Sequence, residues 1–110
     1  MTIWQSLRRK GLNIFTGWFP YKGVDCPDDE LPKHLARGRV YVLGTPAWRV
    51  AFLCPCGCKE MVELCLLKQY RPHWTASVDN EGKVSLSPSV WKKVGCRSHY
   101  FMRNGQIIWV

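Results

Sequence analysis

The chain has 110 residues, of which 46% are hydrophobic and 13% aromatic, so it suits one ordinary domain and is too apolar to be disordered. Its first residues lack the pattern of a secretory signal, and the longest early uncharged run, 11–21, is too short to cross a bilayer. We therefore expect a cytoplasmic protein with reduced cysteines, which favours metal binding over disulfides. The net charge of +8 favours acidic partners, nucleic acid included, although an ordinary solvated surface is the more common reason for such a charge.

Residues 1–22 form the first predicted unit, a basic amphipathic segment. Apolar side chains recur from Ile3 to Phe19 at roughly helical spacing, which predicts an amphipathic helix, although Gly11 and Gly17 weaken that prediction. Such a segment packs on its own domain or on a partner protein, or it lies on a membrane surface. The candidate contact residues are Trp4, Arg8, Arg9, Lys10 and Trp18.

Residues 23–38 are predicted to be an acidic linker. The acidic run 28–30 could open a short helical turn that continues through Leu35. Gly38 would end this turn, because glycine commonly follows the last residue of a helix.

Residues 39–110 are predicted to form a zinc-binding β domain, because strand-forming residues alternate there with turn signals. The expected strands are Arg39–Leu43, Trp48–Cys54, Glu60–Leu67, His73–Val78, Lys83–Leu86 and the two halves of His99–Val110. The last two form a hairpin, since Asn104-Gly105 is a strong two-residue turn signal. That turn sorts the hairpin side chains into two faces, one with Tyr100, Met102, Ile107 and Trp109, the other with His99, Phe101, Ile108 and Val110.

The cysteines indicate a metal site. Cys54, Cys56 and Cys58 are separated by one proline and one glycine, residues that favour a tight turn and so direct several thiols to one place. Cys96 and His99, with two residues between them, offer a further thiol and an imidazole. Zinc takes four tetrahedral Cys and His ligands, so five candidates compete for four positions, with Cys54 the least certain.

Two alternatives to zinc remain open. Iron also suits a tetrahedral thiolate site. Cysteines are also among the most buried residues, and Cys54, if it ends a strand, shares a face with Trp48, Val50 and Phe52 and could be a core thiol. Cys65, within an apolar strand, is expected in the core.

Five motifs resemble a known family. The cysteine turn 54–58 is followed by Arg-Pro-His-Trp at 71–74, Leu-Ser-Pro-Ser-Val-Trp at 86–91, Gly-Cys-Arg-Ser-His-Tyr-Phe at 95–101 and Asn-Gly at 104–105. This order is similar to that of a small bacterial and phage family of unknown function and covers about residues 38–110. Lys59 stands where the resemblance implies a further glycine. Some members are encoded beside bacterial ubiquitin-like proteins and their conjugating enzymes, which implies a protein partner in such a pathway.

The fold class expected is mostly β (α+β), a small compact antiparallel β domain stabilised by zinc, with an N-terminal amphipathic helix. The leading functional hypothesis is a binding or adaptor module of a ubiquitin-like conjugation pathway, in which four protein ligands fill the metal site. A second is a zinc-dependent peptidase or isopeptidase that processes a ubiquitin-like protein, with three protein ligands and one water. A third is a phage or membrane-surface accessory protein that uses residues 1–22.

The catalytic candidates for a zinc peptidase are Glu60, Glu63 and His73, any of which could act as general base. Each also has a structural interpretation, as an exposed or hydrogen-bonded strand residue. Three serines, Ser87, Ser89 and Ser98, offer hydroxyls, but the sequence places no histidine and aspartate to activate them.

Overall fold

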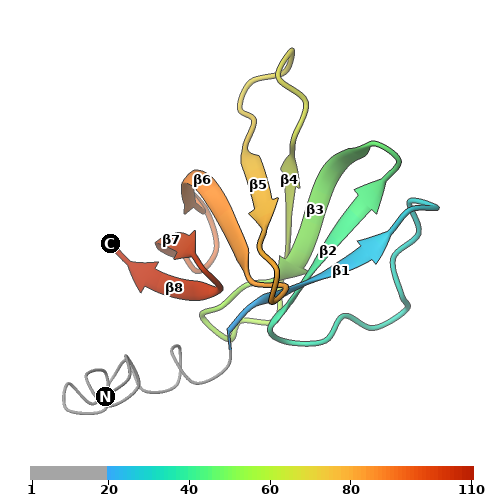
Figure 1. The fold of residues 1–110 in the computed structure, drawn as a ribbon. Coiled ribbons are helices and arrows are strands. Elements are labelled where there is room, and N and C mark those ends of the chain that lie inside the picture. Colours follow the sequence, from blue (N-terminus) through green and yellow to red (C-terminus); the bar gives the residue numbers. More distant parts are fainter. Residues whose placement is uncertain (1–19) are drawn as a thin grey trace.

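A computed structural model describes residues 20–110, and the helix expected before Pro20 lies outside the described residues. The described part folds into two four-stranded sheets (Figure 1). One sheet contains β1 (Lys22–Cys26), β2 (Arg39–Gly44), β3 (Ala47–Leu53) and β4 (Met61–Cys65), in that order. The other contains β5 (Thr75–Val78), β6 (Val84–Trp91), β7 (His99–Arg103) and β8 (Gln106–Trp109). Within residues 20–110 no helix has the length and apolarity to cross a bilayer.

The mostly β prediction is confirmed, and every strand pair but one is antiparallel. The exception is β1, which pairs in parallel with β2 and occupies part of the expected acidic linker. Val24 and Cys26 explain this strand, because they alternate with polar residues and pack against the small buried cluster of Tyr41, Leu43 and Ala51. The alternation is short and lies among acidic residues, so the sequence signal for a strand is weak.

The expected helical turn after β1 is not formed in the structure, where the segment 27–38 contains only turns and bends. The residue before a proline is disfavoured in helical conformation, and Leu31 precedes Pro32. Leu31 and Leu35 instead pack on the same buried cluster as β1. The segment is further held by a hydrogen bond from the Ala36 amide to the Tyr41 hydroxyl, at 2.9 Å.

The two sheets share one hydrophobic core, which gathers buried residues from both. Figure 1 shows β4 and β5 adjacent at the centre of the molecule, and the Trp74 amide bonds there to the Cys65 carbonyl at 2.8 Å. The chain also crosses between the sheets at Tyr21, whose carbonyl accepts from the Val84 amide just before β1 begins. The largest fully buried side chains are Tyr100, Phe52, Leu43, Met102, Val40, Val50 and Val84.

The C-terminal hairpin follows the prediction. Asn104 and Gly105 have φ values of 51° and 78°, as a two-residue hairpin turn requires, and they connect β7 to β8. Met102 pairs with Ile107, and both are buried, whereas Ile108 lies on the opposite face and is exposed. The predicted division of this hairpin into two faces is therefore confirmed.

Candidate metal centre and serine–histidine pair

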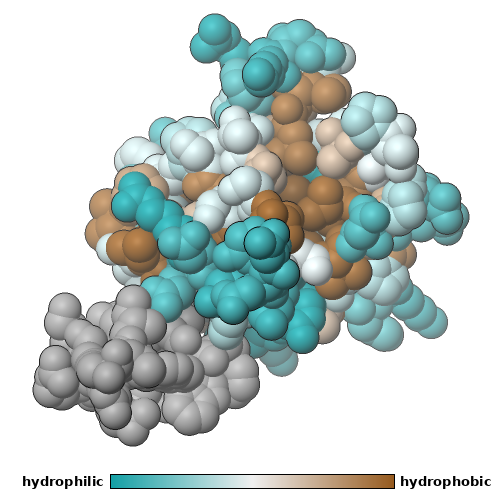
Figure 2. All heavy atoms as spheres, viewed as in Figure 1, coloured by the Kyte–Doolittle hydropathy of each residue, from teal (hydrophilic) through white to brown (hydrophobic). Residues whose placement is uncertain are grey.

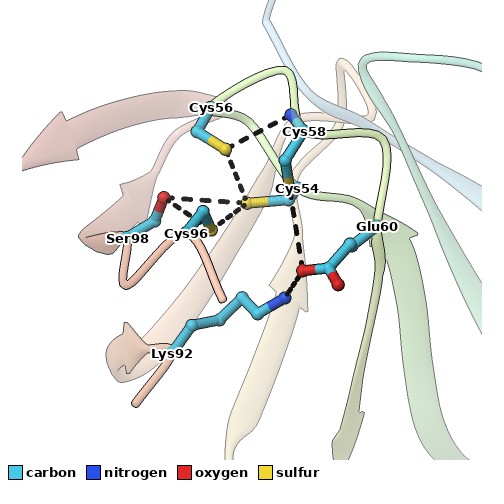
Figure 3. Close-up of polar contacts among 7 residues, drawn as sticks. All are labelled: Cys54, Cys56, Cys58, Glu60, Lys92, Cys96 and Ser98. Atoms are coloured by element: carbon cyan, nitrogen blue, oxygen red, sulfur yellow. Dashed lines mark hydrogen bonds and ion pairs between the residues drawn. The ribbon is translucent and has the colours of Figure 1, made fainter. Parts of the chain in front are cut away.

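Four cysteines from two distant segments meet at one place. Cys54 follows β3, Cys56 and Cys58 lie in the turn between β3 and β4, and Cys96 comes from the loop between β6 and β7 (Figure 3). Their sulfur atoms all lie within 4.8 Å of one another. The Cys54 sulfur is 3.5 Å from that of Cys56 and 3.7 Å from that of Cys96.

The turn that carries three of these thiols depends on unusual backbone angles. Gly57 has a φ of 93° and Lys59 a φ of 67°, both in the left-handed region that favours glycine. The turn is closed by the Cys54 amide, which donates to the Glu60 carbonyl at 2.8 Å. The position of Lys59 is where the family resemblance implies a glycine, and its conformation gives the physical reason.

The spacing of the four sulfurs fits a tetrahedral metal ion. Zinc–sulfur bonds of about 2.3 Å at tetrahedral angles place the sulfurs about 3.8 Å apart. The two shortest Cys54 separations are close to that value, and the other pairs need only small adjustments. The four cysteines could therefore hold a metal ion with no help from a fifth residue.

The Ser98 side chain forms hydrogen bonds with the thiol group. Its buried hydroxyl lies 3.2 Å from the Cys96 sulfur and 3.8 Å from the Cys54 sulfur. The Ser98 hydrogen bond lowers the pKa of the Cys96 thiol to about 6, whereas burial raises the pKa of Cys54 to about 12. The Cys58 amide also donates to the Cys56 sulfur at 3.3 Å. Such donors stabilise thiolates, the form in which cysteine binds a metal.

The three carboxylate and imidazole candidates for a zinc peptidase occupy separate places. Glu60 is near the thiols, with its carboxylate 3.8 Å from the Cys58 sulfur, but it forms an ion pair with Lys92 that lowers its pKa (Figure 3). Glu63 pairs with Arg49 on the first sheet. His73 directs Nδ1 to the Tyr70 carbonyl at 2.9 Å, in the loop between β4 and β5. The structure thus brings only Glu60 to the thiol group.

His99, the fifth expected ligand, is not among the four grouped residues. Its Nε2 lies 3.0 Å from the Ser89 hydroxyl, which is hydrogen-bonding distance. Its ring stacks on Trp91, with centroids 4.8 Å apart and planes 9° from parallel. Among residues 20–110 the structure records no carboxylate on the other ring nitrogen of His99. Serine and histidine in this geometry are a nucleophile and a base suited to acyl transfer.

An irregularity in β6 creates the pair. Val90 pairs with Tyr100 and Trp91 with His99, but the next pair along is Leu86 with Met102. Three residues of β6, 87–89, therefore face a single residue of β7, and this bulge re-aims the Ser89 side chain. The Ser89 carbonyl is fixed in turn by the Trp74 indole, which donates to it at 3.2 Å.

The segment 96–99 links the metal centre to the serine–histidine pair. Cys96 carries a thiol of the group, Ser98 bonds to that thiol, and His99 is the next residue. The Lys92 amide donates to the Ser98 carbonyl at 2.8 Å and closes the loop between β6 and β7. A metal ion bound by Cys96 would therefore also restrict the start of β7, where His99 lies.

Sequence reasoning noted the Ser89 hydroxyl but did not connect it to His99. Two signals could have done so. Trp91 and His99 lie at the ends of strands joined by a short loop, and Ser89 shares a face with Trp91 because it is two residues away. Both Ser89 and His99 also lie within the motifs that carry the family resemblance.

The fold and the site define a class: small two-sheet β proteins that carry a four-cysteine cluster beside a half-buried serine–histidine pair. A family model described as "Bacterial ubiquitination-like system serine protease (BubE)" matches residues 27–110, and the chain belongs to this family. This result confirms the expected association with a bacterial ubiquitin-like system, and with it the expectation of protein partners. Neither the curated proteins nor the solved structures contain a match.

Proposed function

We propose that this protein is a serine-dependent peptidase or isopeptidase of a bacterial ubiquitin-like system, in which Ser89 is the nucleophile and His99 the general base. The observation that carries the proposal is the 3.0 Å contact between the Ser89 hydroxyl and His99 Nε2. The family description, which names a serine protease, supports the same chemistry. The substrate would be a ubiquitin-like protein, either its precursor or its conjugate.

The reaction follows from the two side chains. His99 Nε2 accepts the Ser89 proton as the serine oxygen attacks the scissile carbonyl, and the resulting imidazolium then protonates the leaving amine. The ubiquitin-like chain remains on Ser89 as an ester. A water molecule, deprotonated by His99, attacks this ester, and the proton returns to the Ser89 oxygen as the free carboxylic acid leaves.

Aromatic side chains would hold the pair in place, a role that an aspartate has in many serine proteases. The parallel Trp91 ring restricts rotation of the His99 imidazole and offers a π face to the imidazolium that forms during attack. The Trp74 indole anchors the backbone of Ser89. Both contacts keep the hydroxyl and the base at reacting distance before substrate binds.

The four-cysteine group would bind zinc in a structural role. Zinc suits four thiolate ligands, and a structural site is filled by protein ligands alone. A catalytic zinc keeps a position for water, which four thiols leave no room for. The chemistry of this donor set therefore favours the serine mechanism over the zinc-dependent one, with Glu60, Glu63 and His73 outside the reaction.

A binding or adaptor module remains the second candidate function. The observation in its favour is the same closed group of four thiols, since a structural metal is as suitable for a module as for an enzyme. The two candidates differ in whether Ser89 is needed for chemistry.

The test is cleavage of a fusion between the ubiquitin-like protein of the same operon and a reporter domain. Ser89→Ala should abolish cleavage, a loss of about a thousandfold or more, because the nucleophile is absent. Ser87→Ala is the matched control, since Ser87 is exposed and lies on the other side of Pro88, and the hydroxyl recorded at hydrogen-bonding distance from His99 is that of Ser89. Cleavage by the Ser89→Ala protein at the wild-type rate would refute Ser89 as the nucleophile, and no cleavage by the wild-type protein would leave the adaptor function in its place.

A further inference from the structure

The outer face of the second sheet is apolar around His99. Side chains alternate along β7, so His99 and Phe101 lie on the outer face while Tyr100 and Met102 are buried. Trp91 is paired with His99 across β6 and β7, so its side chain lies on the same face.

Strand β8 completes this surface on the other side of His99. Ile108 is paired with Phe101, and the Val110 amide donates to the His99 carbonyl at 3.0 Å. Side chains at such paired positions lie about 5 Å apart. The residues Trp91, Phe101, Ile108 and Val110 thus surround the imidazole, and we refer to them as the apolar face.

The apolar face is open to solvent. Trp91 is 54% exposed, Ile108 43% and Val110 72%. Figure 2 shows hydrophobic atoms at the surface over β7 and β8, and they come from the strands that carry His99 and its neighbours. Contiguous apolar surface that is exposed to water commonly marks a binding site, and this surface lies beside the proposed nucleophile.

Two cations border this face, and each forms a cation–π contact with one of its aromatic rings. The Arg103 guanidinium lies 4.4 Å above the Phe101 ring, and the Lys93 ammonium lies 4.4 Å above the Trp91 ring. Within the part of the chain that the structure describes, neither cation forms an ion pair, whereas Lys92, the neighbour of Lys93, does. Both cations are therefore available to a carboxylate of a bound molecule.

We propose that the apolar face seats the substrate polypeptide, and that it selects a segment with bulky apolar side chains and at least one aspartate or glutamate close to the scissile bond. This inference rests on the proposed function, because it assigns a substrate to the same serine–histidine pair. The apolar face lies next to the pair, because Trp91 stacks on His99 and the other members of the face are on β7 and β8 beside it. A peptide bound with its carbonyl at Ser89 would therefore have this face within reach. The bordering cations select acidic chains and disfavour basic ones.

The test is peptide binding to the full chain carrying Ser89→Ala, measured by fluorescence anisotropy. The probe is a labelled ten-residue peptide with two leucines and two aspartates in a glycine–serine background. Two matched peptides replace the leucines by serine or the aspartates by asparagine. The first peptide should bind at least about tenfold more tightly than either matched peptide, which corresponds to about 1.4 kcal/mol.

Three variants, each added to Ser89→Ala, locate the binding surface. Ile108→Ser and Arg103→Gln should each weaken binding about tenfold, because one removes apolar contact and the other a charge. Met61→Ser is the control, since Met61 is 48% exposed, similar to Ile108, but lies on β4 of the other sheet. It should leave binding unchanged.

Several results would overturn the inference. Equal affinity for all three peptides, no binding of any peptide, or an equal loss in Met61→Ser would each place the substrate elsewhere. Self-association of the wild-type chain that Ile108→Ser abolishes would make the face a contact between two copies. Because binding is measured without the nucleophile, failure of the hydrolytic mechanism and failure of this surface give different results.

Discussion

Lys59 offers the sharpest test of how the cysteine turn is built. Its φ of 67° is in the left-handed region, which costs a residue with a side chain about 1–2 kcal/mol. Glycine avoids this cost but loses about 0.5–1 kcal/mol more conformational entropy on folding. Since Lys59 is exposed and forms no ion pair within residues 20–110, Lys59→Gly should stabilise the protein by about 0.5–1 kcal/mol.

The assay for Lys59→Gly is thermal unfolding of the metal-loaded protein followed by circular dichroism. The expected rise in Tm is about 2–6 °C for a domain of this size. Gly57→Ala is the opposite change: open space surrounds the added methyl group, so the φ of 93° alone should lower stability by about 1 kcal/mol or more. Lys68→Gly, at an exposed loop residue outside the left-handed region, should be neutral or destabilising. A lower Tm for Lys59→Gly would refute this account of the turn.

Two further predictions concern the functional site: the first separates the metal centre from the serine–histidine pair, and the second tests the hydrogen bond that holds the Ser89 backbone. His99→Gln should keep about one zinc per chain by elemental analysis and lose cleavage, whereas Cys96→Ser should lose both metal and stability, because binding free energy is folding free energy here. Loss of zinc in His99→Gln would restore that residue to the ligand set. Trp74→Phe keeps an aromatic side chain but removes the indole N–H that bonds to the Ser89 carbonyl, so cleavage should slow about tenfold while Tm falls by only a few degrees. An unchanged cleavage rate would show that this anchor is not needed.

The strands that the sequence predicts well are those with strong local signals. Asn104-Gly105 determines the last hairpin, because few other residues adopt its two positive φ values, and the alternating residues on either side then follow. The sequence does not predict strand β1, because the segment 27–38 separates it from its parallel partner with no hairpin signal and its own apolar pattern has only two residues. The sequence also does not predict the second half of β6, because Pro88 argues against a strand. In the structure Pro88 lies at a bulge, where a residue without a backbone N–H is tolerated.

The candidate site was only partly accessible from sequence. The three closely spaced cysteines predict a shared turn, and Cys96, which the sequence also offers as a ligand, lies beside them in the structure. The sequence predicts His99 as a metal ligand because a cysteine and a histidine with two residues between them are a common pair of ligands. Its contact with Ser89 depends on a register shift between β6 and β7. No local residue pattern predicts the register in which two strands pair.

The measurement that tests the central claim most directly is covalent labelling of the full chain with a fluorophosphonate, followed by peptide mapping. These reagents phosphonylate an activated serine and need no knowledge of the natural substrate. The account predicts one adduct per chain, on Ser89, which His99→Gln suppresses and which unfolding of the protein abolishes. An adduct on Ser87 or Ser98 instead, or labelling of Ser89 that is unaffected by His99→Gln, would contradict it.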